Sequence, residues 1–458
     1  MLDFKYMIKR VLFDRKRINP ARRVVLGFVF IILIGALLLM LPISARNGQS
    51  TDFFTCLFTA TSTTCVTGLT LVDTYTHWSF FGHVIMICLI QIGGLGFMTI
   101  LSLAFFMSHR RIGLRDRMMM MQSFNLDSME GVVKLVRHVL TATLVIEGVG
   151  AMILAGCFIP QMGLARGIWS GIFHSISAFC NAGFDILGKY DPNSSLIHYQ
   201  RNAVVLLTIS ALIIIGGLGF FVWEDIYQQK NRRRLSLHSK MVLIITPALL
   251  FIGTAGFFIM EMNNPETLGG LPWWDKLLGA FFQSTTARTA GFDAMGQAGI
   301  TEQSKLLTTI LMFIGGSSGS TAGGVKTVTV GILVLTTIST MQSKRDLVIF
   351  GWRIGHTQIL YAVSLIILGA FLVVCGGLFI SLLDNVSLYD AIYETASAYG
   401  TVGLTSGVTE NASTLSRTIL ILYMFFGRVG IMTVSISVLL RGRQGDGIKY
   451  PGGSVLIG

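Results

Sequence analysis

One short pattern occurs four times along this chain, each time between two long apolar segments. It consists of an aromatic residue, a Ser or Thr four positions later, and a Gly followed by Leu or Phe six positions after the hydroxyl. The copies are Phe58/Ser62/Gly68/Leu69, Phe173/Ser177/Gly183/Phe184, Phe281/Thr285/Gly291/Phe292 and Tyr393/Ser397/Gly403/Leu404. Because the glycines lie roughly 110 positions apart, the spacing indicates four repeats of one structural unit.

The composition places these repeats in a membrane. Hydrophobic residues make up 52% of the 458 positions and charged residues only 13%, whereas a soluble domain carries about 25% charged residues. Eight apolar segments are long enough to cross a bilayer, two per repeat. They are Val24–Leu41, Ser79–Phe106, Val139–Ile159, Ala203–Val222, Met241–Ile259, Leu306–Leu335 (interrupted), Ile359–Leu383 and Thr418–Leu440. The sequence therefore predicts an all-α integral membrane protein.

The first apolar segment is too long for a cleaved signal peptide, and we expect a retained helix. The six cysteines form no CxxC pair and lie in or beside apolar segments. Buried thiols that act as small hydrophobes are favoured over a disulfide or a metal site.

Positive charge gathers in alternate connections. Most of the 35 Lys and Arg residues lie in segments 1–23, 110–137, 230–240, 344–353 and 441–449. The positive-inside rule makes these segments cytoplasmic, with both termini on the cytoplasmic side of the membrane. All four repeats then start and end inside, which predicts parallel repeats about one axis and excludes inverted repeats. No basic folded surface exists, so a nucleic-acid partner is excluded and the bilayer is expected.

Each repeat contains a half-length segment before its glycine, such as Asp52–Thr63 or Trp273–Thr286. These segments are too short to span, and we expect four re-entrant pore helices around a central ion pore. The predicted division of the chain is a basic N-terminus 1–23, repeat 1 at 24–108, repeat 2 at 132–228, repeat 3 at 238–341, repeat 4 at 356–440, and a cytoplasmic tail 441–458.

The four glycines suit a selectivity filter. A potassium ion that crosses a membrane must exchange water for oxygen ligands, and backbone carbonyls supply them without net charge. Glycine permits the unusual backbone conformation and the close approach that this requires. A single glycine in an apolar segment is more often a packing residue, but four at equivalent positions favour a filter. The expected ion-binding residues are Thr67, Gly68, Ala182, Gly183, Ala290, Gly291, Val402 and Gly403.

The second helix of the third repeat is interrupted. Half of the residues from 315 to 324 are glycine, and each interior glycine costs a helix about 1 kcal/mol relative to alanine. We expect a loop at membrane depth, under the filter, within 314–327. A phosphate-binding loop is the competing interpretation, but the lysine does not directly follow the glycine and no strand precedes the segment.

Three basic residues fall at membrane depth, where charge is expensive and normally faces a pore or a partner. We expect Arg288 to brace its loop by hydrogen bonds to backbone carbonyls. Arg428 is favoured as functional, and Lys326 follows the glycine-rich loop.

Two other classes of membrane protein would leave different sequence patterns. An organic-solute transporter would need inverted repeats and a polar midplane site. An intramembrane enzyme would need a nucleophile–base pair or metal ligands, and the histidines lack metal-ligand spacing. Neither pattern is present, and no enzyme is predicted. The alternative that stays open is a sodium-coupled secondary transporter of another small cation or solute.

The chain resembles the Ktr/Trk/HKT superfamily of cation transporters, most closely the KtrB-like membrane subunit of bacterial Ktr potassium uptake systems. The resemblance covers nearly the whole chain. It rests on the four filter segments, the glycine-rich interruption, Arg428, and the tail segment Tyr450-Pro451-Gly452-Gly453. Some plant relatives carry serine at the first filter glycine and favour sodium, so Gly68 implies potassium.

The resemblance implies an intramembrane gate beneath the filter. The gate residues would be Gly315, Gly316, Ser317, Ser318, Gly319, Gly323, Gly324, Lys326 and Arg428. It also implies a homodimer bound to a separate cytosolic nucleotide-binding ring, with no cofactor held by this chain. Potassium would be the transported ion and the only metal, in the filter. Whether sodium activates transport is left open.

Overall fold

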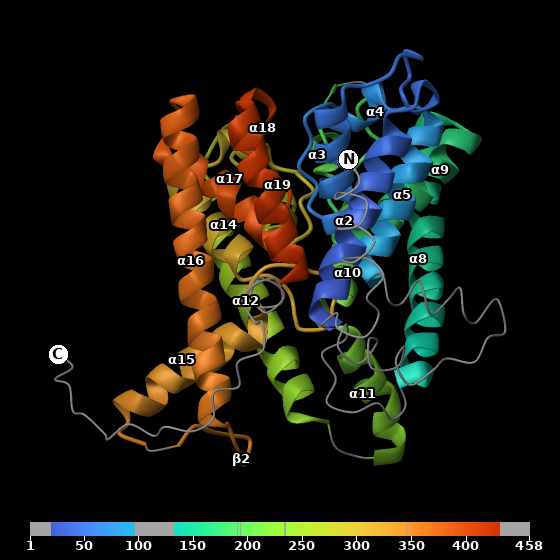
Figure 1. Cartoon of the computed structure of the whole chain (residues 1–458). Coiled ribbons are helices and arrows are strands. Elements are labelled where there is room, and N and C mark those ends of the chain that lie inside the picture. Colours follow the sequence, from blue (N-terminus) through green and yellow to red (C-terminus); the bar gives the residue numbers. More distant parts are fainter. Residues whose placement is uncertain are drawn as a thin grey trace, which may run out of the picture.

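The computed structural model describes residues 20–96, 132–189, 191–192, 194–232, 235–344 and 346–430. Four long helices are each followed by a short one. The long helices are α2 (Pro20–Leu39), α8 (Val132–Met162), α12 (Leu237–Glu261) and α16 (His356–Asp384). The short helices are α3 (Phe53–Cys65), α9 (Leu164–Phe179), α13 (Trp273–Thr286) and α17 (Leu388–Gly400). Each long helix packs against the short helix that follows it, and α3, α9 and α17 lie in the upper half of Figure 1.

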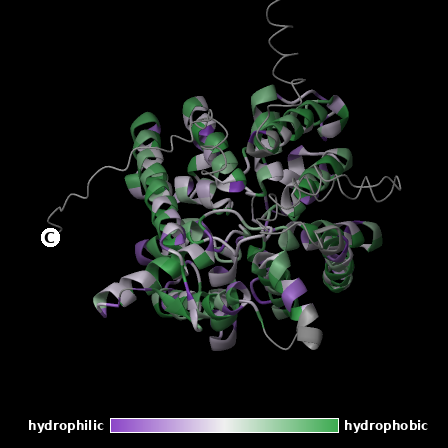
Figure 2. Ribbon diagram, turned by 60° about the horizontal axis from the view of Figure 1, so that its bottom comes forward, coloured by the Kyte–Doolittle hydropathy of each residue, from purple (hydrophilic) through white to green (hydrophobic). Residues whose placement is uncertain are grey.

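A further apolar helix follows each short one. These are α5 (Phe80–Leu95), α10 (Ala203–Leu218), α14 (Glu302–Phe313) and α19 (Thr414–Val429). The other elements are α4 (Thr74–His77), α11 (Phe220–Arg232), α15 (Thr327–Met341), α18 (Val408–Asn411) and the 3₁₀ turns η1 (Pro42–Ser44), η2 (Ile197–Tyr199) and η3 (Gln297–Gly299). Viewed from below, the helices surround a centre where the loops converge (Figure 2).

The helices begin where polar side chains cap them. Asp52 accepts hydrogen bonds from the amides of Phe54 and Thr55 at the start of α3. Ser79, Asn202, Thr301 and Ser413 do the same for α5, α10, α14 and α19. Since the first amides of a helix have no partner within the helix, these residues fix the starting points.

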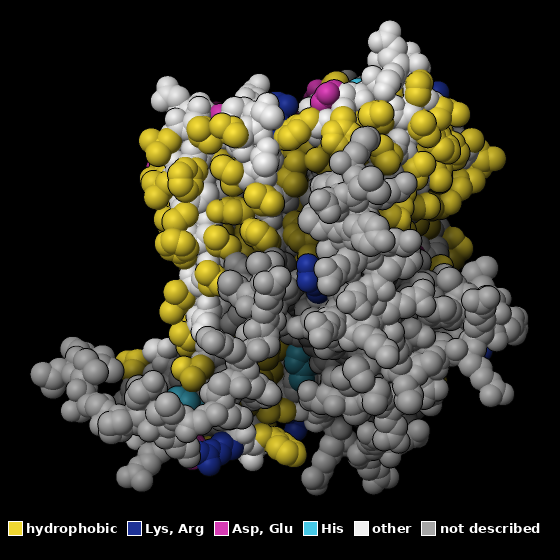
Figure 3. All heavy atoms as spheres, in the orientation of Figure 1, with side chains coloured by type: hydrophobic (Ala, Val, Ile, Leu, Met, Phe, Trp, Pro, Cys, Tyr) yellow, Lys and Arg dark blue, Asp and Glu magenta, His cyan; other side chains and the backbone are white. Residues whose placement is uncertain are grey.

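Within the described residues, α8, α12 and α16 are long and apolar enough to cross a membrane. The pair α10–α11 makes a fourth span if it is counted as one. Figure 3 shows apolar side chains over the upper part of the visible helices, with charged groups at the upper and lower ends. The eight predicted spans are thus matched only in part, and the ends of Ser79–Phe106 and Thr418–Leu440 lie outside the described residues.

The predicted span Ala203–Val222 is broken. Helices α10 and α11 meet at 88°, and Gly219 between them has φ +100°. Gly96 and Gly430 end α5 and α19 in the same left-handed conformation, at +81° and +88°, which glycine adopts without steric cost. In each of the glycine clusters Gly93–Gly96, Gly216–Gly219 and Gly427–Gly430, the last glycine therefore ends the helix.

Their first member does serve packing. A Cβ atom on Gly93, Gly216 or Gly427 would overlap the carbonyl oxygen of Thr64, Phe179 or Tyr399. These glycines therefore let the apolar helix touch the end of the short helix.

Within the described residues, one small hairpin departs from the all-α prediction. Strands β1 (Val348–Ile349) and β2 (Trp352–Arg353) pair antiparallel. The two-residue turn Phe350–Gly351 has φ values of +50° and +81°, as tight hairpin turns require.

Candidate functional site

The four predicted filter glycines form a closed ring. Gly68 lies against Ala182 and Gly183, Gly183 against Ala290 and Gly291, Gly291 against Val402 and Gly403, and Gly403 against Thr67 and Gly68. A Cβ atom at any of the four glycines would come within 2.6 Å of the neighbouring carbonyl oxygen. Segments more than 300 residues apart in sequence thus meet, and only glycine fits where they do.

The four loops share one backbone conformation. The glycines have φ values of +97°, +69°, +79° and +96°. The residues two positions earlier, Val66, Asn181, Thr289 and Thr401, also have positive φ, between +51° and +90°. Non-glycine residues in this region are strained, and such strain persists where the surroundings enforce it. Four equivalent strained turns indicate a shared role.

The carbonyl oxygens of the ring have no hydrogen-bond donor in the part of the chain that the structure describes. No described residue donates a hydrogen bond to the carbonyls of residues 66–68, 181–183, 289–291 or 401–403. The backbone amides of Thr67, Ala182 and Val402 donate to the carbonyls of Ser62, Ser177 and Ser397 at 2.7–2.8 Å. Buried carbonyls are rarely left without a partner, so this ring presents oxygen atoms that a dehydrated cation can bind.

Hydroxyl groups brace the loops from behind. Gly68 N and Gly403 N donate to the hydroxyls of Ser62 and Ser397 at 3.1 and 3.0 Å. The hydroxyl of Ser177 donates to the carbonyl of Phe184 at 2.7 Å. The repeated hydroxyl of the sequence pattern thus holds the loop that carries the glycine.

The third copy of the pattern was misassigned by one residue. Thr286, not Thr285, donates to the carbonyl of Phe292 at 2.8 Å, while Thr285 donates to Phe281 in its own helix. Phe282 is fully buried and Phe281 is not. The loop is one residue shorter here, and the run Ser284-Thr285-Thr286 made the wrong register fit the pattern.

The glycine-rich segment forms a loop between α14 and α15, directly against the ring. Gly323 abuts the side chain of Thr401, and Gly315 abuts Thr289. The side-chain amide nitrogen Nδ2 of Asn181 donates to the Thr321 hydroxyl at 3.0 Å. The loop therefore contacts the residues that precede three of the four ring glycines.

Backbone hydrogen bonds hold this loop. Gly315 N donates to Val325 at 2.9 Å, Thr327 N to Gly316 at 3.1 Å, and Ser317 N to Gly217 at 3.0 Å. Gly319 accepts from Phe220 at 2.8 Å. The other predicted members of the loop also meet backbone: the carbonyl of Ser318 lies against Gly219, and Gly324 lies against Gly400.

Two cations bind the carbonyls of this loop. The guanidinium of Arg428 donates to Thr321 in the loop and to Gly93 and Gly94 at the end of α5. The ammonium of Lys326 donates to Ala322 and Gly323 at 2.7 and 3.2 Å. Arg428 thus joins the loop to the first and last apolar helices, α5 and α19.

Arg288 lies behind the third loop. Its side chain is buried, and its Nη1 lies 3.5 Å from the Thr246 carbonyl of α12. This is the bracing position expected from the sequence.

Two acidic features escaped the sequence analysis. Glu147 of α8 is buried, and Gln91 donates to both of its oxygens at 3.1 and 3.2 Å. A single carboxylate in the apolar run Val139–Ile159 was the available sequence signal for Glu147.

Acidic residues also lie just after the ring. Asp185 and Asp293 each follow a ring glycine by two residues. Burial, together with the nearby carboxylates of Asp73 and Asp293, raises the pKa of Asp185 to about 6.

Comparisons with known proteins show the family of the chain. Residues 19–445 match the TrkH family, described as cation transport protein. The potassium/sodium uptake protein NtpJ of Enterococcus hirae is 41% identical over 99% of both chains. The Ktr system potassium uptake protein B of Bacillus subtilis is 38% identical over 96% of this chain and 97% of that one.

A solved structure shares the fold. The potassium transporter TrkH of Vibrio parahaemolyticus superposes with a TM-score of 0.70 at 17% identity, and covers 93% of this chain and 86% of that one. This likeness shows the fold, and the family match establishes the class of protein. The chain belongs to the Ktr/Trk family of membrane cation transporters.

Proposed function

We propose that this chain takes up potassium across the bacterial cytoplasmic membrane through the ring of four glycine loops. The observation that carries the proposal is the closed ring itself, whose backbone carbonyls have no hydrogen-bond donor among the described residues. The names of the relatives, which specify uptake of potassium or of potassium and sodium, support the choice of ion. As a cation transporter, the chain has no enzymatic role.

The ring would act as the selectivity filter. Carbonyls of Thr67, Ala182, Ala290 and Val402, with those of the glycines, would replace the hydration shell of the ion. Oxygen dipoles without net charge bind a cation strongly enough to admit it and weakly enough to release it. The carboxylates near Asp185 would attract cations to one mouth of the ring.

The pore would be built from four parallel repeats, each with a long helix, a pore helix and a second apolar helix. The fourfold order of helices and the equivalent loop conformations support this arrangement. The distribution of basic residues would place both termini in the cytoplasm. The homodimer and the separate cytosolic nucleotide-binding ring rest on the likeness to Ktr membrane subunits.

The loop at 314–327 would gate this pore. It lies directly against the ring, and Arg428 and Lys326 bind its carbonyls. Both cations would repel a permeating ion in a low-dielectric space, where repulsion exceeds its value in water severalfold. The closed loop would therefore block passage by volume and by charge.

Gly68→Ser tests the filter. Gly68 has φ +97°, and a Cβ there would lie 2.6 Å from the Ala182 carbonyl oxygen. The substitution is expected to lower the ratio of potassium to sodium uptake by roughly tenfold, because a displaced carbonyl changes the ligand geometry. The two rates would be measured in transport-deficient cells at equal expression.

Gly48→Ser is the matched control. Gly48 also has positive φ, +71°, but no atom lies within 4 Å of its added Cβ. It should leave the ratio unchanged. An unaltered ratio in Gly68→Ser, with both variants in the membrane, would remove Gly68 from the filter.

Deletion of Ser317–Thr321 tests the gate. This stretch carries the contacts of the loop to Gly217, Phe220 and Arg428. The shortened protein should conduct potassium faster, and its flux should depend less on the regulatory ring, since the obstruction is smaller. Flux into vesicles measures the effect. A folded deletion variant that conducts more slowly would show that the segment is structural.

A further inference from the structure

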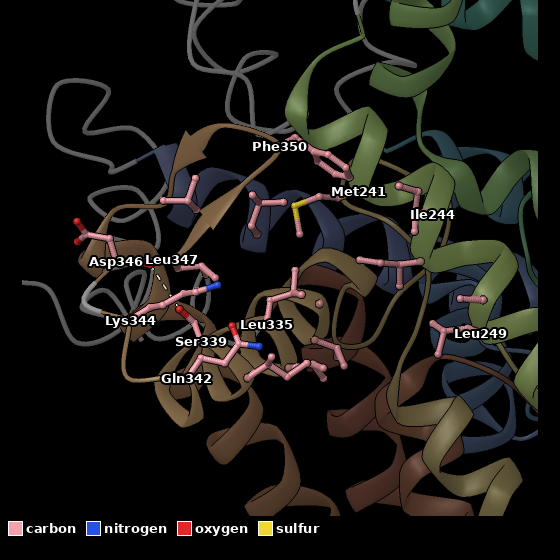
Figure 4. A pocket seen from close by; sticks show the side chains of 18 residues that line it. Met241, Ile244, Leu249, Leu335, Ser339, Gln342, Lys344, Asp346, Leu347 and Phe350 are labelled. Carbon is pink, nitrogen blue, oxygen red and sulfur yellow. Dashed lines mark hydrogen bonds between the residues drawn. The ribbon is translucent and has the colours of Figure 1, made fainter.

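A large apolar cavity lies away from the ring, between α12, α15 and the β1–β2 hairpin (Figure 4). Its volume is about 920 Å³. Helix α15 starts at Thr327, immediately after the glycine-rich loop, and slants away from the helices around the ring in Figure 1. This departure opens the space between α15 and α12.

The two ends of the cavity differ in polarity. Lys344, Ser339 and Gln342 gather at one end, while Ile244 and Leu249 of α12 lie toward the other (Figure 4). Along α12 the apolar lining runs deeper into a predicted membrane span, because α12 is one of the three membrane-length helices. The polar end lies beside the hairpin, in a segment that the charge distribution assigns to the cytoplasmic face.

The apolar end of the cavity, which runs along α12, is suited to binding hydrocarbon. Ile244, Val334 and Ile338 are all about half exposed on the cavity walls. Apolar walls at membrane depth face acyl chains rather than water. The cavity is therefore shaped for the chain of a lipid from the inner leaflet.

The polar end of the cavity, beside the hairpin, carries positive charge. Lys344 lines the cavity, and the ammonium of Lys240 lies 5.8 Å from the ring centre of Phe350. Among the described residues, no carboxylate forms an ion pair with either lysine. Asp346 also lines the cavity, but its carboxylate is paired with Arg353 at 2.7 Å. Two cations beside an apolar slot at the cytoplasmic interface complement an anionic headgroup.

The hairpin places this end at the membrane surface. Trp352 and Phe350 are both exposed on it, and exposed aromatic side chains are enriched at the level of the headgroups. The same hairpin contributes Leu347–Phe350 to the cavity wall.

We propose that the cavity is a binding site for an anionic phospholipid of the inner leaflet. One acyl chain lies between α12 and α15 and extends toward Leu249. The phosphate lies between Lys240 and Lys344, and the side-chain amide of Gln342 is available to it as a donor. The lipid packs against the helix that carries the end of the glycine-rich loop, a contact that exists whether or not the loop gates transport.

The test measures bound lipid directly. The full-length protein is extracted from vesicles that contain equal amounts of phosphatidylglycerol and phosphatidylcholine with identical chains, and retained lipid is counted by native mass spectrometry. Phosphatidylglycerol should be retained preferentially. Lys240→Gln with Lys344→Gln should remove this preference, by roughly fivefold per lysine.

Ala248→Phe fills the cavity from an exposed position of α12. It should eliminate the tightly held lipid whichever headgroup is offered. Matched controls are Ala370→Phe, on the exposed surface of α16, and Lys276→Gln, whose ammonium binds the Met262 carbonyl far from the cavity. Both controls should retain the lipid as the unmodified chain does.

Three results would overturn the proposal. The first is equal retention of the two headgroups in the unmodified protein. The second is unchanged lipid in Ala248→Phe, which shows that the cavity holds none. The third is dissociation of a dimer in Ala248→Phe with lipid binding intact, which assigns the cavity to a second copy of the chain.

Discussion

Replacing Gly291 by alanine is expected to reduce potassium uptake at least tenfold while the protein still reaches the membrane. Gly291 has φ +79°, and its Cβ would overlap the carbonyl oxygen of Val402 in the next loop. The left-handed conformation costs an alanine about 1 kcal/mol. The overlap forces Val402, one of the proposed ligands, out of the ring.

The measurement is potassium uptake by a transport-deficient strain at equal membrane expression. Gly407→Ala separates the effect of backbone strain from the effect of the overlap with Val402. Gly407 has φ +94°, but no atom lies within 4 Å of its added Cβ. That variant carries the backbone strain without the overlap and should transport normally. Uptake at the unmodified rate in Gly291→Ala would show that ions do not pass through the ring.

Arg428→Ala is expected to raise the maximal rate of potassium uptake severalfold with little change in selectivity. The guanidinium binds the carbonyl of Thr321 and so holds the loop against the ring. It also places a positive charge near the proposed path in a low-dielectric space. Both effects oppose permeation, so the loss of either one should raise the rate of potassium uptake. Selectivity would be set at the glycines and should persist.

Arg428→Lys is the matched variant. A lysine keeps the charge but lacks the planar fork that spans Thr321, Gly93 and Gly94. Its maximal rate should fall between those of the unmodified chain and Arg428→Ala. Thermal stability is measured in parallel, because the carbonyls at the end of α5 lose a donor. A large loss of uptake in a stable, well-expressed Arg428→Ala protein would show that the arginine supports the open pore.

Local composition predicted the main elements of the fold. Apolar runs indicated the long helices, and the half-length segment Trp273–Thr286 coincides with α13. The glycine-rich interruption between α14 and α15 also followed from helix propensity alone. These three features depend on short stretches of chain, and sequence patterns describe such stretches well.

Features that depend on contacts between distant segments were not predictable. The true register of the third copy is set by the burial of Phe282 and the bond from Thr286 to Phe292, and consecutive hydroxyls concealed it. The ends of helices at Gly96, Gly219 and Gly430 depend on backbone conformation that glycine permits but does not require. The hydrogen bond from Gln91 to Glu147 joins α5 to α8, and no periodic pattern in the sequence indicates it.

The most direct test of the central claim is ion flux through the purified chain in liposomes, without any other protein. Vesicles loaded with potassium or with sodium are diluted into the other ion, and the reversal of the membrane potential reports which cation permeates. We expect a potential set by the potassium gradient, which Gly68→Ser shifts toward the sodium gradient and Gly48→Ser does not. A potential that follows both ions equally in the unmodified chain would contradict a potassium-selective ring.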